Sequence, residues 1–109
     1  MTIIRPGEFW LADITFTNRA SSKKRPVLVL WLEANAVVVA AVTSAAPRSA
    51  RDIALADWSA AGLRLPSVVR LSYLDCLERS LLFARVGMIS PTDAELVKQS
   101  WARHVRPNF

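Results

Sequence analysis

Cysteine and histidine are almost absent from this chain of 109 residues, which has one of each. A single thiol, Cys76, rules out an internal disulfide bond and a zinc site built from several cysteines. Asp75 and Glu78 flank this cysteine, but their spacing matches no metal-ligand pattern. We therefore expect no bound metal and no other cofactor.

Long apolar runs are missing as well. The most apolar region is divided by Glu33 and Asn35 into the pieces Val27–Leu32 and Ala36–Val42. Each piece is far shorter than the roughly 20 residues that a membrane-spanning helix needs. The first residues contain one arginine and then Pro6-Gly7-Glu8, without the apolar centre of a signal peptide. We expect a soluble protein of the cytoplasm.

Composition indicates an ordinary globular protein with a basic surface. Hydrophobic residues make up 52% and charged residues 21%, so the chain has enough apolar material for a core. At this length a single domain over residues 1–109 is the expectation. The formal net charge of +5 favours an anionic partner such as nucleic acid or an acidic protein.

Short apolar segments bounded by turn residues predict a mainly β fold. The expected strands are Glu8–Ile14, Val27–Leu32, Val37–Val42, Asp52–Ala56, Ser67–Leu71 and Leu82–Ile89. The second and third are apolar on both faces, which is typical of strands covered on both sides. Tyr73–Leu81 is ambiguous between a helical turn and a loop.

The end of the chain carries the signature of one helix. Ser90 suits the N-cap, Pro91 the first helical position, and Asp93 completes the spacing of a capping box. An apolar stripe follows at helical spacing, and Pro107 ends it. The stripe consists of Ala94, Val97, Trp101 and Val105. The sequence therefore predicts a small barrel or twisted antiparallel sheet closed by a C-terminal helix.

A basic stretch precedes the second predicted strand. Residues 17–25 contain Arg19, Lys23, Lys24 and Arg25 and no acidic residue. Pro26 fixes its own φ and restricts the preceding residue, so Arg25 lies at a rigid strand entrance. A guanidinium held in this way suits phosphate, whose oxygens it bonds in a bidentate manner. On composition alone, a solvated basic loop capped by a strand is the favoured interpretation, because basic loops are common.

Five segments, in this order and over nearly the whole chain, resemble the MazF/PemK family of toxin endoribonucleases. They are Gly7–Asp13, Lys24–Val29, Val42–Ser44, Gly62-Leu63 with Pro66–Arg70, and Arg85–Ser90. The resemblance implies an SH3-like barrel, a homodimer, and metal-independent, sequence-selective cleavage of single-stranded RNA. It also implies inhibition by a cognate acidic antitoxin that lies over the RNA groove.

The resemblance assigns site residues unevenly. Arg25 matches the catalytic arginine of the family, Thr43 the catalytic threonine, and Ser44 its neighbour at the substrate phosphate. Arg70 matches an arginine that some members use. Those members carry an acidic residue two positions later, where this chain has Ser72, so the resemblance leaves the general base unassigned.

Other residues are open to two interpretations. We expect the RNA-binding surface to include Lys23, Lys24, Arg48, Arg51, Ser67 and Arg70, although Arg48 and Arg51 also fit a role in solubility. Trp58 is suited to stacking on a base or to packing in the core or against a partner. His104 fits a surface position near the helix end better than a catalytic one. We expect Trp10, Trp31 and Trp101 in the core.

Two other functions stay open. One is a toxin of the same fold that binds DNA gyrase and has no catalytic site. Arg25 with Thr43 argues against it, because a protein that only binds has no need of that pair. The other is a degenerate family member that only binds protein or DNA, which the loss of an acidic residue at Ser72 allows.

Overall fold

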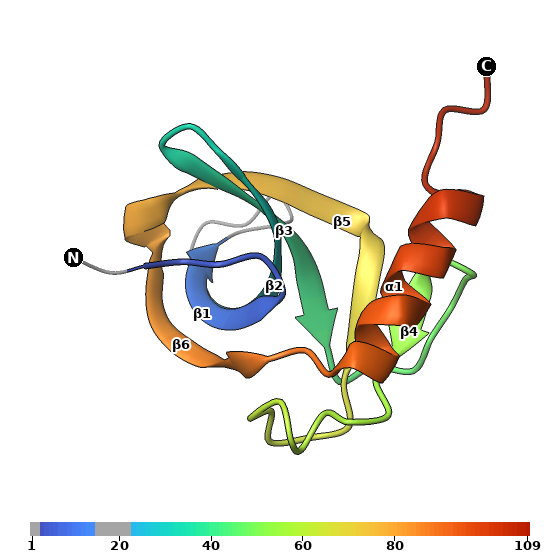
Figure 1. The fold of residues 1–109 in the computed structure, drawn as a ribbon, viewed down its shortest axis with the longest axis horizontal. Helices are drawn as coiled ribbons and strands as arrows, with labels where there is room; N and C mark the ends of the chain where they lie inside the picture. The colour runs from blue at the N-terminus through green and yellow to red at the C-terminus, as the bar shows by residue number, and fades with distance from the viewer. Residues whose placement is uncertain (1–2, 15–22) are drawn as a thin grey trace.

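In the part of the chain that the structure describes, six antiparallel strands and one C-terminal α-helix make up the fold (Figure 1). The computed structural model describes residues 3–14 and 23–109, so Arg19 lies outside the described residues. The elements are β1 (Glu8–Ile14), β2 (Lys23–Glu33), β3 (Ala36–Thr43), β4 (Asp52–Ala54), β5 (Val68–Glu78), the 3₁₀ helix η1 (Arg79–Leu81), β6 (Leu82–Met88) and α1 (Pro91–His104). The predicted mainly β class with a C-terminal helix is confirmed.

The strands form one sheet in the order β4-β5-β3-β2-β1-β6. Figure 1 shows this sheet rolled up, with α1 beside β4. Within the described residues no pairing joins β4 to β6, so the roll is an open barrel. The described residues also include no helix long and apolar enough to cross a membrane.

Strand β2 starts earlier than the sequence predicts. The basic stretch pairs with β1, where Asp13 faces Lys24 and Ala12 faces Arg25. The prediction began this strand at Val27 because the residues before it are polar, but a neighbouring strand offers their backbone groups partners. Arg25 therefore lies within a strand and not at its entrance.

Strand β5 runs far beyond the predicted Leu71 and contains a bulge. Ala40 of β3 faces Leu74, whereas the next residue, Ala41, faces Arg70. Residues 71–73 thus bulge from the ladder, which bends the strand. The ambiguous segment after Ser72 becomes strand because β3 supplies pairing partners as far as Glu78.

Two apolar cores lie on opposite faces of β2, since alternate residues of a strand point in opposite directions. One contains Phe9, Leu28, Val42, Val69 and Val97, the other Trp10, Val27, Val29, Val37 and Val39. Trp101 packs against the first core from α1. The placement of Trp31 in the core is wrong, because its side chain is 41% exposed. It follows a register irregularity in β2 and lies near the end of the β2–β3 hairpin.

The start of α1 holds the preceding loop in place. As predicted, the Ser90 side chain accepts a hydrogen bond from the Asp93 backbone N–H, and Pro91 opens the helix. The buried Asp93 carboxylate accepts from the backbone N–H groups of Ala56 and Asp57, at 2.9 and 2.8 Å. These contacts end β4 at Ala54 and anchor the loop that follows.

Candidate active site

Arg25 and Thr43 lie on neighbouring strands, Arg25 as the third residue of β2 and Thr43 as the last residue of β3. In the β2–β3 ladder Val27 faces Ala41. Extending this register by two residues along each strand brings Arg25 and Thr43 to the same face of the sheet, and both line one cleft. Arg25 is exposed and Thr43 half-buried, and the Thr43 hydroxyl accepts from the Ala45 backbone N–H at 3.1 Å. A guanidinium and an oriented hydroxyl thus share one surface.

Both residues line a cleft of about 550 Å³. Two further residues that the sequence predicted, Ser44 and Ser67, line the same cleft. Its apolar lining includes Leu11, Leu63 and Val86. The cleft combines phosphate-binding groups with an apolar wall, a pairing that suits a nucleotide.

The loop between β4 and β5 forms one wall of the cleft. Gly62 has φ +91°, and a Cβ at this position would lie 2.4 Å from the Val86 carbonyl oxygen. Glycine is therefore required both for its backbone conformation and for the close approach to β6. At the other end of the wall, the Ser67 hydroxyl donates to the Leu65 carbonyl oxygen at 2.7 Å. Ser67 thus shapes the turn as well as lining the cleft.

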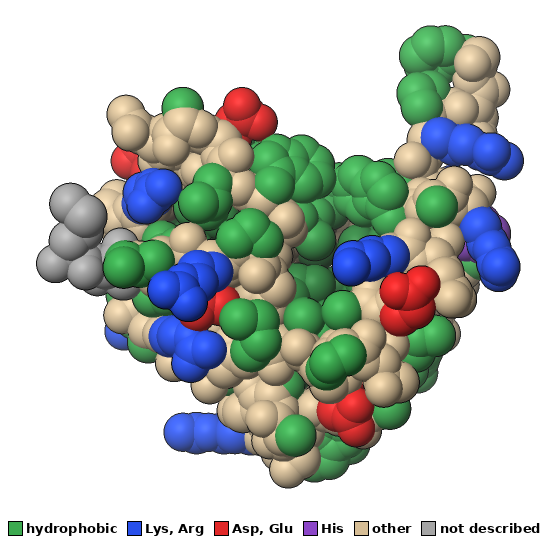
Figure 2. All heavy atoms as spheres, viewed as in Figure 1, with side chains coloured by type: hydrophobic (Ala, Val, Ile, Leu, Met, Phe, Trp, Pro, Cys, Tyr) green, Lys and Arg blue, Asp and Glu red, His purple; other side chains and the backbone are tan. Residues whose placement is uncertain are grey.

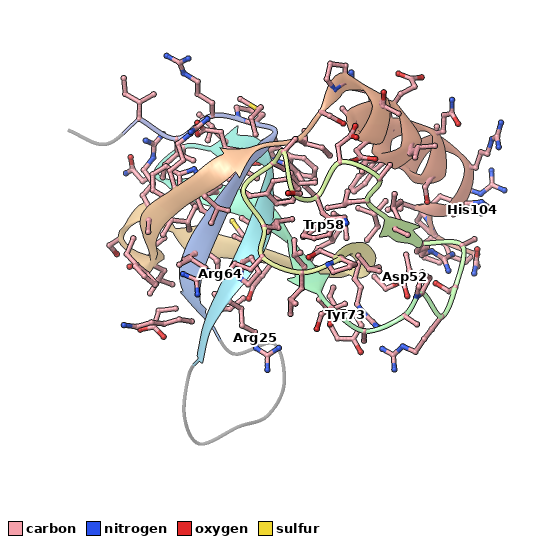
Figure 3. All side chains as sticks on the ribbon, turned by 90° about the horizontal axis from the view of Figure 1, so that it is seen from below. Arg25, Asp52, Trp58, Arg64, Tyr73 and His104 are labelled. Carbon is pink, nitrogen blue, oxygen red and sulfur yellow. The ribbon has the colours of Figure 1, made fainter. Side chains whose placement is uncertain are left out.

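Arg70 shares the face of Arg25 and Thr43. On β3 and β5, Thr43 faces Val68 and Ala41 faces Arg70, so Arg70 is a diagonal neighbour of Thr43. Its guanidinium carbon lies 5.9 Å from the centre of the Tyr73 ring, and its side chain is paired with Asp52. In Figure 3 Arg25, Tyr73 and Asp52 lie along one edge of the molecule.

The remaining predicted basic residues are placed differently. Lys24 Nζ lies 5.2 Å from the centre of the Phe83 ring on β6. Arg51 Nε donates to the His104 carbonyl oxygen at 2.8 Å, which fixes that guanidinium at the end of α1. Arg48 is exposed in the loop before β4. Lys23 lies in β2, and its side chain is outside the described residues.

Sequence reasoning did not select Asp52, Arg64 or Tyr73. Arg64 lines the cleft in the segment between Gly62 and Pro66, where a lone cation flanked by turn residues was the available signal. Asp52 and Tyr73 gain their places from the pairing of β4 with β5 and from the β5 bulge, which no local pattern encodes.

Neither Trp58 nor His104 is among the residues that line the cleft. Trp58 is partly buried and packs against the first core. His104 is half-buried at the last position of α1. Within residues 3–14 and 23–109, no group of three or more His, Cys, Asp or Glu side chains is placed to hold a metal ion.

Comparison with solved structures identifies proteins with the same fold. An endoribonuclease from a mycobacterial species superposes with a TM-score of 0.76 at 15% identity, covering 100% of this chain and 97% of that one. A mycobacterial endoribonuclease in complex with its cognate antitoxin gives 0.74 at 15% identity, covering 94% and 95%. MazF from Deinococcus radiodurans gives 0.74 at 19% identity, covering 96% and 98%. At these identities the likeness establishes the fold.

Sequence comparison establishes the family. No curated protein matches the sequence significantly. The family model of the PemK-like, MazF-like toxins of type II toxin–antitoxin systems matches residues 5–104, almost the whole chain. Arg25, Thr43 and the cleft that they line all fall within the matched region. The chain therefore belongs to the PemK-like, MazF-like family of type II toxin–antitoxin toxins.

Proposed function

We propose that this toxin is an endoribonuclease that cleaves single-stranded RNA selectively by sequence and without a metal ion. The observation that carries the proposal is that Arg25 and Thr43 line the same cleft, in a member of the MazF-like family. The names of the structural neighbours, which include endoribonucleases, agree with it.

RNA supplies its own nucleophile for this reaction. The 2′-hydroxyl oxygen attacks the adjacent phosphorus, the bond from phosphorus to the 5′-oxygen breaks, and a 2′,3′-cyclic phosphate and a free 5′-hydroxyl result. The 2′-oxygen loses one proton and the 5′-oxygen gains one, so no water or metal is consumed. Alignment of the attacking oxygen alone can supply about 7–11 kcal/mol.

In this proposal Arg25 stabilises the charge that develops on the phosphoryl oxygens. One well-placed donor of this kind contributes about 3–4 kcal/mol. Arginine keeps its proton at physiological pH, so Arg25 is an electrostatic group and not a base. Thr43, whose hydroxyl is already oriented by the Ala45 N–H, and Ser44 bond the phosphate or orient the 2′-hydroxyl.

The RNA would cross the face that carries these residues. Arg64 and Ser67 line the cleft, and Arg70 is close to Thr43. Arg48 extends the basic surface. Lys24 contacts Phe83 and Arg51 contacts the end of α1, so these two residues would act at the margin of that surface. Contacts to phosphate make binding depend steeply on salt.

The same surface would bind the antitoxin. An acidic segment, disordered alone and folding as it binds, would place carboxylates where RNA phosphates otherwise lie. RNA and antitoxin should then compete, and simultaneous binding of both would contradict a shared groove. A homodimer in the cytoplasm completes the proposal.

Incubation of the purified protein with a mixed single-stranded RNA in EDTA tests this function. We expect cleavage at a short recurring motif, with ends that carry a 2′,3′-cyclic phosphate and a 5′-hydroxyl. Activity that disappears with the chelator and returns with magnesium would contradict the metal-independent mechanism. Intact RNA under all conditions would favour one of the binding-only alternatives.

A further inference from the structure

Asp52 and Arg70 form an ion pair between β4, the short strand at one edge of the sheet, and its neighbour β5. They face each other in the β4–β5 ladder, and Arg70 Nη1 lies 3.9 Å from Asp52 Oδ2. The Arg70 side chain is 8% exposed and the Asp52 side chain 4% exposed. Charges so withdrawn from water interact more strongly than a surface pair.

Asp52 also ties the surrounding backbone to this pair. Its Oδ2 atom accepts from the Arg48 backbone N–H at 2.8 Å. The Arg51 carbonyl oxygen accepts from the Leu71 N–H at 2.9 Å, at the start of the β5 bulge. One carboxylate thus joins the loop before β4 to the strand that carries Arg70.

The pair leaves Arg70 with hydrogen-bonding capacity. A guanidinium has five N–H donors, and one carboxylate oxygen at 3.9 Å cannot occupy them all. The Tyr73 ring lies 5.9 Å from the guanidinium carbon and limits where the group can move. Arg70 lies on the same face as Thr43, one diagonal step away across β3 and β5.

We propose that Asp52 is a positioning residue that acts through Arg70. It holds the guanidinium so that the donors it leaves free are directed toward a phosphate bound at Arg25 and Thr43. This inference rests on the proposed cleavage of RNA. It assigns roles in the site to a carboxylate and a guanidinium that lie beside the cleft and are not among the residues that line it.

The test is a double-mutant cycle on cleavage of a single-site RNA oligonucleotide. Asp52→Asn keeps an acceptor for the Arg48 N–H but removes the charge that orients Arg70. We expect kcat to fall by about tenfold or more, as for a misplaced group near the reacting atoms, with KM changed less than about twofold. In an Arg70→Ala background, Asp52→Asn should cause no further loss, because the two residues act as one unit.

A control separates positioning from stability. Glu8→Gln alters a second ion pair, between the buried Glu8 and Arg85, outside the proposed site. We expect it to lower the melting temperature and leave kcat unchanged. If Asp52→Asn does not fold, Asp52→Glu is measured in its place, because it keeps the charge but moves it by one methylene. A lower kcat in Asp52→Glu is then the expected result, and a wild-type kcat overturns the inference.

The outcomes are distinct. A wild-type protein that cleaves no RNA contradicts the proposed function itself. A cleaving wild type with wild-type kcat in Asp52→Asn overturns the inference alone. An equal loss from Asp52→Asn with and without Arg70 also overturns it, because Asp52 would then act independently of Arg70.

Discussion

Gly87 on β6 and Ala61 in the loop after β4 approach so closely that no side chain fits between them. A Cβ built on Gly87 would lie 1.9 Å from the Ala61 carbonyl oxygen. Gly62, next along the loop, makes a similar approach to Val86. These contacts between backbones position the cleft wall that includes Leu63 and Arg64.

Gly87→Ala should displace that wall. The methyl group collides with backbone, which cannot rotate away as a side chain would, so we expect a loss of about 1–3 kcal/mol in unfolding free energy. Trypsin should cut faster after Arg64 once the wall is displaced. Met88→Ala, at the neighbouring exposed position, is the control and should change stability by less than about 0.5 kcal/mol. Unchanged proteolysis in Gly87→Ala would show that the contact does not hold the wall.

Arg25→Ala should lower kcat about a hundredfold or more, as for the loss of one donor to a developing oxyanion. Arg25→Lys should recover little, because lysine keeps the charge but lacks the planar fork. The measurement is single-turnover cleavage of a defined oligonucleotide. Arg79→Ala, which removes the same charge from η1, is the control and should cleave normally. A lysine variant at the wild-type rate would reduce Arg25 to a generic charge.

The buried Glu8 carboxylate accepts hydrogen bonds from three donors. Its Oε1 atom accepts from the Arg5 backbone N–H at 2.7 Å and from Trp10 Nε1 at 3.2 Å, and its Oε2 atom accepts from Arg85 Nε. Burial raises the pKa of Glu8, but the hydrogen bonds and the Arg85 charge outweigh it, so the pKa falls below its usual value. The folded state therefore favours the ionised form.

This shift makes stability depend on pH. A carboxyl whose pKa is lowered by folding stabilises the protein above its unfolded pKa, about 4.3, and loses that contribution as pH falls through the folded value. Glu8→Gln should lower the unfolding free energy by about 1 kcal/mol at pH 7, with the difference shrinking below about pH 4. Urea unfolding across this range measures it. Glu33→Gln is a matched control, because the exposed Glu33 also accepts from a tryptophan Nε1, that of Trp31. A Glu8→Gln deficit that persists at low pH would contradict the linkage.

Local sequence patterns predicted those features that local chemistry determines. Short apolar segments bounded by turn residues located β1 and β6, and Ser90 with Pro91 located the start of α1 to the residue. The same patterns could not show that the Asp93 carboxylate bonds to Ala56 and Asp57 instead of completing the cap, because those partners come from a distant loop.

The site residues likewise divide into those that local motifs reveal and those that only the fold brings together. Arg25 and Thr43 could be selected from short motifs, and the structure brings both to one cleft. Asp52 could not, since its proximity to Arg70 depends on how β4 and β5 pair. Arg51 could not be recognised as a residue bound to the end of α1, because that contact joins residues 53 positions apart.

Trp31 should be part of a dimer interface. It is 41% exposed on β2, and its ring meets that of Trp101 edge to face, with centroids 5.8 Å apart. Figure 2 shows apolar side chains gathered between the β2–β3 hairpin and α1. An exposed apolar patch of this kind is typical of an interaction surface, because a bound partner removes it from water.

A second copy of the chain is the expected partner, and Trp31→Asp should weaken its association about thirtyfold or more, because tryptophan is a common interface hot spot. Sedimentation equilibrium at micromolar concentration measures the dimer. Phe83→Asp is the matched control, since Phe83 is 47% exposed on the edge strand β6, and it should leave the dimer intact. A wild-type monomer at this concentration would contradict the homodimer. Equal weakening by both substitutions would place the interface elsewhere, because a charge on β6 should not disturb a contact made through the hairpin and α1.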